Sequence, residues 1–200
     1  MDKENLLAFF GAFNPPTRAH IELAEAAMRA SGRDGVIFVP SKSVYITEDQ
    51  KKNYAFSEAE RLEMLEKIAE NRPWMMVTDI EFRQEQQPRT YTTLCMLRDQ
   101  DLQASLLIGA DKLIELESAW CFVPEIAEEF GIVCMGRGDM DAEEIIRNSP
   151  FLSALHITVV KIPDTFRNVS STKVRETLQE ISRLKQYLRE LLPPELADLE

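Results

Sequence analysis

The chain has 200 residues, of which 44% are hydrophobic and 28% are charged, a composition typical of a globular protein that buries a full core. Its formal net charge of −11, from 23 basic and 34 acidic residues, argues against a nucleic-acid partner, because an acidic surface repels a phosphate backbone. No apolar run approaches the roughly 18 residues of a membrane span, and the start MDKENLL lacks the features of a signal peptide. We therefore expect a cytoplasmic protein that binds neither nucleic acid nor membrane.

The first half of the chain alternates short apolar runs with amphipathic stretches. Strands are predicted at residues 5–11, 36–40 and 74–82, and helices at 18–30, at 57–70 and from Thr93 onward. Ser57 and Glu60 have the spacing of a capping box at the start of the second helix. Residues 41–56 show no periodicity, and we interpret this long stretch as a binding loop.

The second half continues the alternation, with strands predicted at 104–110, 131–136 and 155–162. Two helical patterns follow over residues 170–192, and we expect both helices to pack on or beside the sheet. Alternating strands and helices predict one α/β domain over 1–200, with a parallel sheet covered on both faces. The cysteines lack CxxC spacing and are predicted to be reduced core residues: Cys95, Cys121 and Cys134.

The segment GAFNPPTRAH joins the first predicted strand to the first helix. Gly11 permits a sharp exit from the strand, two prolines stiffen the turn, and Thr17 is a good N-cap for a helix that carries His20 in its first turn. A strand that turns into a helix directs backbone N–H groups and the positive end of the helix dipole at one point, which suits a phosphate. Taken alone, His20 is more simply interpreted as a surface histidine of the helix.

A second segment, NVSSTKVRETL, places cap-type residues at a helix start and cationic side chains within one turn of them. This arrangement predicts an anion site, with an ordinary capped helix as the alternative. A third segment, LLIGADKLIELESAW, ends a strand at Gly109 and places Asp111 where an acid can accept hydrogen bonds from a ribose. Asp111 could equally cap the next helix, and Trp120 could equally pack in the core.

Together, GAFNPPTRAH and VSSTKVR resemble the two signatures of the nucleotidyltransferase superfamily, G-x-F-x-P-x-[TH]-x-x-H and I-S-S-T-x-x-R. GADKLIELESAW resembles the G-A-D-x-[LM]…W segment of its nicotinate or nicotinamide mononucleotide adenylyltransferases, and the likeness covers nearly the whole chain. The resemblance implies a Rossmann-like, doubly wound parallel sheet with a short C-terminal helical segment. It also implies that ATP and a pyridine mononucleotide meet above the sheet, with Mg²⁺ bound mainly through the ATP phosphates and no metal ligand from the protein.

The same resemblance implies roles for single residues. His20 and Arg175 would be catalytic, contacting phosphate during in-line attack of the mononucleotide phosphate on the α-phosphorus of ATP. The residues implied to bind ATP are Gly11, Ala12, Phe13, Thr17, His20, Gly109, Asp111, Ser170, Ser171, Thr172 and Arg175. Those implied to bind the mononucleotide are Asn14, Lys42, Thr90, Trp120 and Arg137.

Two departures from the family pattern leave questions open. Ala12 stands where relatives have Ser, Thr or Gly, so only a backbone N–H could serve there, and the 41–56 loop lacks the P-P-H-K run of bacterial relatives. Nicotinate mononucleotide is the expected acceptor, with nicotinamide mononucleotide or another small phosphate-bearing acceptor as the alternative; a homo-oligomer is possible. Two other enzyme classes fit the sequence less well. A phosphopantetheine adenylyltransferase would lack the G-A-D…W segment, and an oxidoreductase that binds a dinucleotide would need G-x-G-x-x-G after the first strand. A non-catalytic nucleotide-binding protein on the same fold remains a further alternative.

Overall fold

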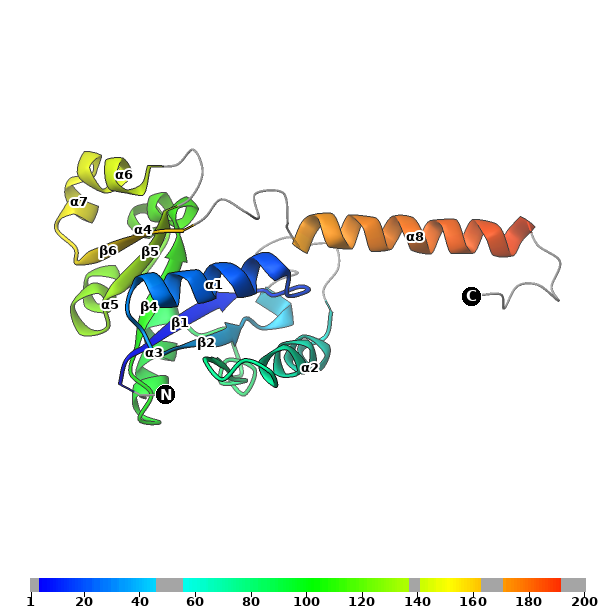
Figure 1. The fold of residues 1–200 in the computed structure, drawn as a ribbon, viewed down its shortest axis with the longest axis horizontal. Coiled ribbons are helices and arrows are strands. Elements are labelled where there is room, and N and C mark those ends of the chain that lie inside the picture. The colour runs from blue at the N-terminus through cyan, green and yellow to red at the C-terminus, as the bar shows by residue number, and fades with distance from the viewer. Residues whose placement is uncertain (1–3, 46–55, 137–140, 163–170, 192–200) are drawn as a thin grey trace.

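The computed structural model describes residues 4–45, 56–136, 141–162 and 171–191, with the backbone alone described for 184–191. Within these ranges, six strands form a single parallel sheet in the order β3-β2-β1-β4-β5-β6 (Figure 1). The strands are β1 (Leu6–Gly11), β2 (Gly35–Pro40), β3 (Met75–Val77), β4 (Ala104–Gly109), β5 (Ile132–Gly136) and β6 (Ile157–Lys161).

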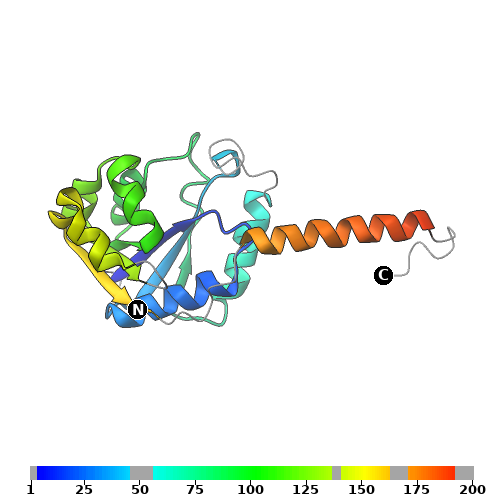
Figure 2. The same cartoon turned by 90° about the horizontal axis from the view of Figure 1, so that it is seen from above.

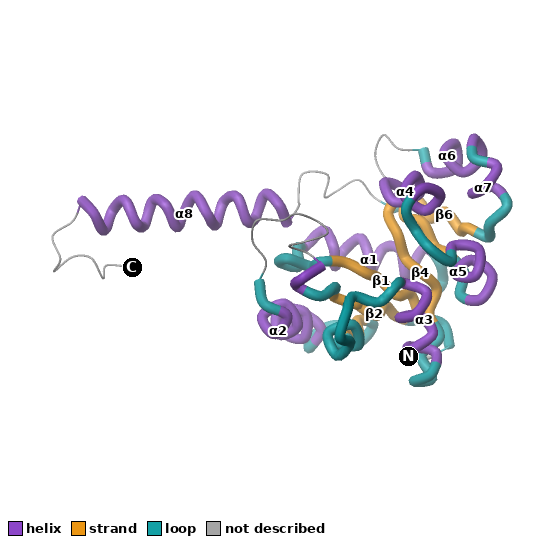
Figure 3. The backbone as a smooth tube through the Cα atoms, turned by 180° about the vertical axis from the view of Figure 1, so that it is seen from behind, coloured by secondary structure: helices purple, strands orange, loops and turns teal. Residues whose placement is uncertain are grey.

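Helices cover both faces of the sheet, because the side chains of each strand alternate between its two sides. On one face Leu7, Val36 and Phe38 pack against the first two helices, while on the other Leu6, Ala8 and Ile37 pack against the later ones. Figure 3 shows the second face from behind, with α3, α4 and α5 over the strands. The helices are α1 (Arg18–Ala30), α2 (Glu58–Ala69), α3 (Thr90–Arg98), η2 (Ala110–Lys112), α4 (Leu113–Ser118), α5 (Val123–Glu129), α6 (Ala142–Asn148), α7 (Pro150–Ser153) and α8 (Ser171–Leu191).

The strand order places a topological switch point between β1 and β4. The chain runs outward from β1 through β2 to β3, then returns to the other side of β1 and continues through β4, β5 and β6. Phe9 pairs with Leu107, and the same register continued by two residues sets Gly11 beside Gly109. Ligands of open parallel sheets bind beyond the carboxyl ends of the strands at such a point, so two strand-ending glycines face the expected crevice.

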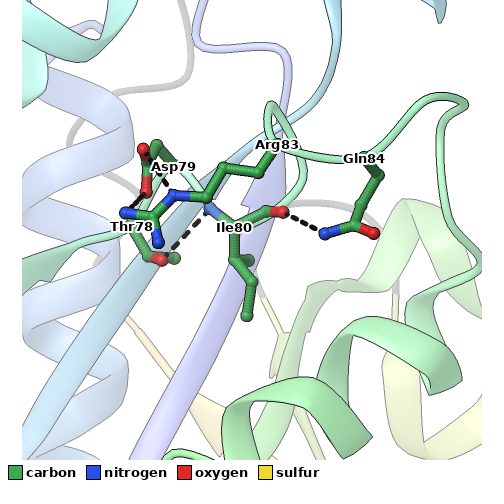
Figure 4. A network of polar contacts seen from close by, with 5 residues as sticks. All are labelled: Thr78, Asp79, Ile80, Arg83 and Gln84. Carbon is green, nitrogen blue, oxygen red and sulfur yellow. Dashed lines mark hydrogen bonds and ion pairs between the residues drawn. The ribbon is translucent and has the colours of Figure 1, made fainter.

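The predicted doubly wound α/β class is confirmed, but the strand predicted over 74–82 is wrong beyond residue 77. Residues after Val77 form a compact turn, because short polar side chains offer the backbone local partners (Figure 4). Ile80 N–H donates to Thr78 Oγ1 at 3.2 Å, Arg83 Nε donates to Asp79 Oδ2 at 2.9 Å, and Gln84 Nε2 donates to the Ile80 carbonyl at 3.1 Å.

The C-terminal prediction needs correction as well. Residues Ser171–Leu191 form a single helix rather than two, and no proline or glycine interrupts this stretch of the chain. In Figures 1 and 2 α8 extends away from the sheet instead of packing along it. None of the described helices is both long and apolar enough to span a membrane.

Only one of the three cysteines matches the prediction of a core residue. Cys134 on β5 is fully buried, and burial raises the pKa of its thiol to about 12, with the negative charge of Asp111 adding to the shift. Cys95 is half-buried and Cys121 is exposed between α4 and α5. All three are free thiols.

Candidate active site

The turn from β1 into α1 is built around a buried aromatic ring. Phe13 has a φ of 42°, in the left-handed region, and its side chain is only 1% exposed. The ring packs edge-on against those of Phe9 and His20, at centroid distances of 5.5 and 5.2 Å. The ring lies against Gly11, where a Cβ would come within 3.1 Å of it. Because the side chain is buried, Phe13 could offer a ligand only its backbone.

His20 is oriented by the start of its own helix. It stands at the third position after the Thr17 N-cap, where a capping box usually has Glu or Gln, and its Nδ1 accepts a hydrogen bond from Thr17 N–H at 3.0 Å. Accepting at Nδ1 fixes the tautomer of the neutral ring, with its proton on Nε2. The helix cap therefore determines which nitrogen of His20 carries a donor.

The first turn of α8 lies against the same β1–α1 turn, although 156 to 161 residues separate the contacting positions in the chain. Ser171 Oγ donates to the Pro15 carbonyl at 2.8 Å, and Arg175 Nη1 donates to the Asn14 carbonyl at 2.6 Å. Arg175 Nη2 also donates to Thr172 Oγ1 at 3.1 Å within the helix. The two segments that carry the histidine and arginine signatures are thus joined by direct hydrogen bonds.

Across the switch point, β4 ends at Gly109 and the chain passes into η2. The exposed Asp111 folds its carboxylate back over Gly109, so closely that a methyl group there would collide with Oδ1. The absence of a side chain at Gly109 is therefore what allows the carboxylate to lie at the strand end. This carboxylate follows β4, and the β1–α1 turn at Gly11 follows β1, which is the neighbour of β4 in the sheet.

The segment after β2 is fastened to the turn after β3 by a buried polar chain. Lys42 N–H donates to Gln87 Oε1 at 2.8 Å, and Gln87 Nε2 donates to Glu81 Oε2 at 2.6 Å. Glu81, only 2% exposed, also accepts from Thr93 Oγ1 at 2.9 Å. Burial raises the pKa of Glu81 to about 7, although the hydrogen bonds from Gln87 and Thr93 and the charge of Lys42 oppose the rise.

Lys42 uses its ammonium group on the protein itself. Its Nζ donates to the carbonyls of Phe82 and Gln84, at 3.0 and 2.7 Å. Lys42 thereby holds the turn after β3 in place, and its contact with a mononucleotide stays a prediction.

Comparison with known proteins agrees with this geometry. The family model described as cytidylyltransferase-like matches residues 8–177. The chain is 30% identical over 185 residues to a protein of Lachnoclostridium phytofermentans named "probable nicotinate-nucleotide adenylyltransferase", covering 90% of both chains. It is 26% identical over 195 residues to the nicotinamide/nicotinic acid mononucleotide adenylyltransferase of Oryza sativa, covering 90% of this chain and 78% of that one.

The chain belongs to the cytidylyltransferase-like family, among its mononucleotide adenylyltransferases. Its fold also matches the solved nicotinic acid mononucleotide adenylyltransferase of Plasmodium falciparum, with a TM-score of 0.64 at 19% identity, covering 86% of this chain and 83% of the other. That enzyme was solved in complex with NaAD. At this identity the match shows the shared fold alone, and the roles of single residues stay predictions.

Within this family fold, the remaining predicted residues lie in different settings. Thr90 begins α3, and Trp120 is half-buried between α4 and α5, where it packs against the core of the same sheet face. Asn14 is fully buried, and its Oδ1 accepts from Phe56 N–H at 2.8 Å. Ser170 and Arg137 lie outside the described residues.

The described part of the chain holds no group of three or more His, Cys, Asp or Glu side chains that could bind a metal ion. A hollow of about 800 Å³ opens between α1 and α2, but it shares only Pro16 and Thr17 with the residues described above. The strand ends remain the better candidate, because the switch point lies there.

Two buried groups near the site were not predicted from the sequence. Arg61, in α2, reaches the β1–α1 turn, and Glu81 anchors the polar chain to Lys42. Both sit in stretches rich in charged residues, where a solvated side chain is the ordinary expectation. No pattern in the sequence would have distinguished them from their exposed neighbours.

Proposed function

We propose that this protein transfers the adenylyl group of ATP to nicotinate mononucleotide, giving deamido-NAD and pyrophosphate. The observation that carries the proposal is the pair of hydrogen bonds that holds Arg175 and Ser171 against the turn bearing His20. Those bonds hold the first turn of α8, with Arg175, against the turn that leads to His20, and this supports a phosphate site shared by both signatures. Family membership supplies the reaction class.

The proposed reaction is a single in-line displacement. An oxygen of the mononucleotide phosphate forms a bond to the α-phosphorus of ATP while the bond to the β-phosphate oxygen breaks, and pyrophosphate leaves with that electron pair. Catalysis then depends on positioning and on neutralising negative charge, so cations and N–H donors matter more than a general base. His20 would donate from Nε2 to the α-phosphate, and Arg175 and Thr172 would hold the β- and γ-phosphates.

The nucleoside and the acceptor would occupy the two sides of the switch point. Asp111 would accept hydrogen bonds from the adenosine ribose, in keeping with its place at the end of β4. The acceptor would lie toward Asn14, Thr90 and Trp120. Any Mg²⁺ would arrive on the ATP phosphates, and we propose a cytoplasmic location for the enzyme.

Nicotinamide mononucleotide is the second candidate acceptor. The relatives from Oryza sativa and Arabidopsis thaliana are named for both the nicotinamide and the nicotinic acid forms, whereas several bacterial relatives are named for the nicotinate form alone. A carboxylate on the pyridine would favour the nicotinate form if a local cation or N–H pair faces it.

A coupled assay of pyrophosphate release tests the proposal. The protein is incubated with ATP and Mg²⁺ plus nicotinate mononucleotide, nicotinamide mononucleotide or phosphopantetheine, and His20→Gln serves as the matched inactive variant. We expect release with the two pyridine mononucleotides, faster with the nicotinate form, and none with phosphopantetheine. Absence of release with both pyridine acceptors would overturn the proposal.

A further inference from the structure

Arg61 is a fully buried guanidinium group beside the proposed site. Its donors reach three separate segments: Nη1 to the Ala12 carbonyl at 2.7 Å, Nη2 to Ser43 Oγ at 3.1 Å and Nε to the Phe56 carbonyl at 3.2 Å. The plane also lies over the ring of Phe82, 5.1 Å from its centroid. One side chain therefore ties the β1–α1 turn to the segment after β2, to the residue before α2 and to the turn after β3.

The acceptors of these hydrogen bonds are carbonyl and hydroxyl oxygens rather than carboxylates. Burial lowers the pKa of Arg61 to about 10, and the charge of Glu58 offsets only part of that cost. A buried guanidinium without a carboxylate partner is costly, and an apolar replacement would in turn leave the Ala12 and Phe56 carbonyls without this donor. The position therefore calls for an explanation beyond packing.

The bond to Ala12 controls the direction of an amide. In a trans peptide the C=O and the next N–H point to opposite sides, so drawing the Ala12 carbonyl toward Arg61 points Phe13 N–H the other way. The Phe13 side chain is buried and Ala12 has no hydroxyl, so neither offers a ligand a polar side-chain atom. The backbone of this turn is thus the part that matters for a phosphate, and Arg61 sets its orientation.

The other two hydrogen bonds of Arg61 orient segments on the side of the site proposed to hold the acceptor mononucleotide. Phe56 N–H donates to the buried Asn14 side chain, while its carbonyl accepts from Arg61. Ser43, whose hydroxyl accepts from Arg61, directly follows Lys42, and its own N–H donates to Glu58 at 2.9 Å. Movement of Arg61 would therefore shift segments on both sides of the reacting phosphates.

We propose that Arg61 is a positioning residue for adenylyl transfer, which holds the phosphate-binding turn and the segment after β2 in one fixed arrangement. This inference rests on the proposed function. Arg61 acts through Ala12, Ser43 and Phe56 and does not itself touch substrate. We expect removal of Arg61 to lower kcat more than it raises KM, because misaligned groups lose contacts mainly in the transition state.

The test compares Arg61→Met, Arg61→Lys and Ser43→Ala with Arg72→Lys. The last is a matched control, because the described hydrogen bond of Arg72 also goes to a backbone carbonyl, but to that of Ile68 in α2 rather than to one of the turn. We expect Arg61→Met to lower kcat about 100-fold and Arg61→Lys about tenfold, with Arg72→Lys unchanged. Ser43→Ala should lower kcat in the wild-type background and have no further effect beside Arg61→Met, since both changes remove the same contact.

Hydrogen exchange supplies a readout that does not depend on turnover. In Arg61→Lys we expect faster exchange in peptides covering residues 9–17 and 41–45, and unchanged exchange in β4 and β5. Equal acceleration throughout the sheet, or wild-type kcat in the folded Arg61 variants, would overturn the positioning role. If the wild-type protein releases no pyrophosphate, the proposed function fails, while the exchange experiment still decides whether Arg61 orders the turn.

Discussion

Glu81 should make the stability of this protein fall as the pH rises through the neutral range. Burial is the main cause of its raised pKa, about 7 in the folded chain against an ordinary value of 4.5. Between these values the folded state holds a proton that the unfolded state has released. Unfolding free energy therefore decreases with rising pH, the opposite of the behaviour of a carboxylate in an ion pair.

The size of the effect follows from the two pKa values. The difference between these pKa values corresponds to roughly 3 kcal/mol in total, at about 1.36 kcal/mol for each tenfold change in proton affinity, and most of it falls between pH 5 and pH 8. Glu81 is only 2% exposed, so solvent screens this term little. Other titrating groups contribute their own slopes, and a matched variant is needed to separate them.

Glu81→Gln is that variant, because its amide can reproduce the hydrogen bonds of the protonated carboxyl. Its oxygen can accept from Gln87, and its NH₂ can donate to Thr93, whose hydroxyl then donates to the Arg89 carbonyl at 3.4 Å. We expect urea denaturation to show the variant gaining roughly 2 to 3 kcal/mol of unfolding free energy over the wild type between pH 5 and pH 8. A difference between the two proteins that stays constant with pH would refute the reasoning.

Three further changes test the proposed site. His20→Gln keeps a side chain suited to the helix cap, whereas His20→Ala also loses the cap. Steady-state kinetics should show kcat lowered on the order of 10²-fold in both variants. Urea denaturation should show a loss of about 1 kcal/mol of stability in the alanine variant only. Gly109→Ala should displace the Asp111 carboxylate and raise KM for ATP about tenfold with little change in unfolding free energy, and an unchanged KM would separate Asp111 from the ribose. Arg175→Lys should lower kcat/KM by about 10–100-fold, because lysine lacks the planar fork that lets Nη1 bond Asn14 while Nη2 bonds Thr172. Wild-type kinetics would exclude this role.

The sheet could be predicted from the sequence because its signal is local and strong. Buried parallel strands appear as continuous apolar runs, and the strands β1, β2, β4, β5 and β6 begin and end within two residues of the prediction. The strand at 74–82 was overestimated because DIEF alternates in polarity like a strand, whereas Asp79 and Thr78 stabilise a turn. Helix α3 begins at Thr90, three residues before the expected position, because its N-cap is Arg89, a residue outside the usual capping types.

The site was only partly predictable because its parts depend on different distances along the chain. Thr17 and His20 lie within one turn, so their relation follows from local spacing. The contact of Arg175 with Asn14 requires the whole fold, and only the family signatures pointed to it. The burial of Arg61 and Glu81 could be recognised only from the packed structure, since nothing in a run of charged residues indicates which side chain turns inward.

The cations around the switch point also explain how an acidic protein can hold two anionic substrates. On the outer face of α1 arginines form ion pairs with glutamates one turn away, as in Arg18 with Glu22 at 3.0 Å, and these pairs cancel their own charge. The described hydrogen bonds of Lys42, Arg61 and Arg175 instead go to carbonyl and hydroxyl oxygens, which orient the cations, while the carboxylates of Glu81 and Glu58 act on Lys42 and Arg61 through space. Cationic donors are therefore oriented beside the strand ends of a chain whose net charge is −11, and the placement of charge, more than its total, determines which anions bind.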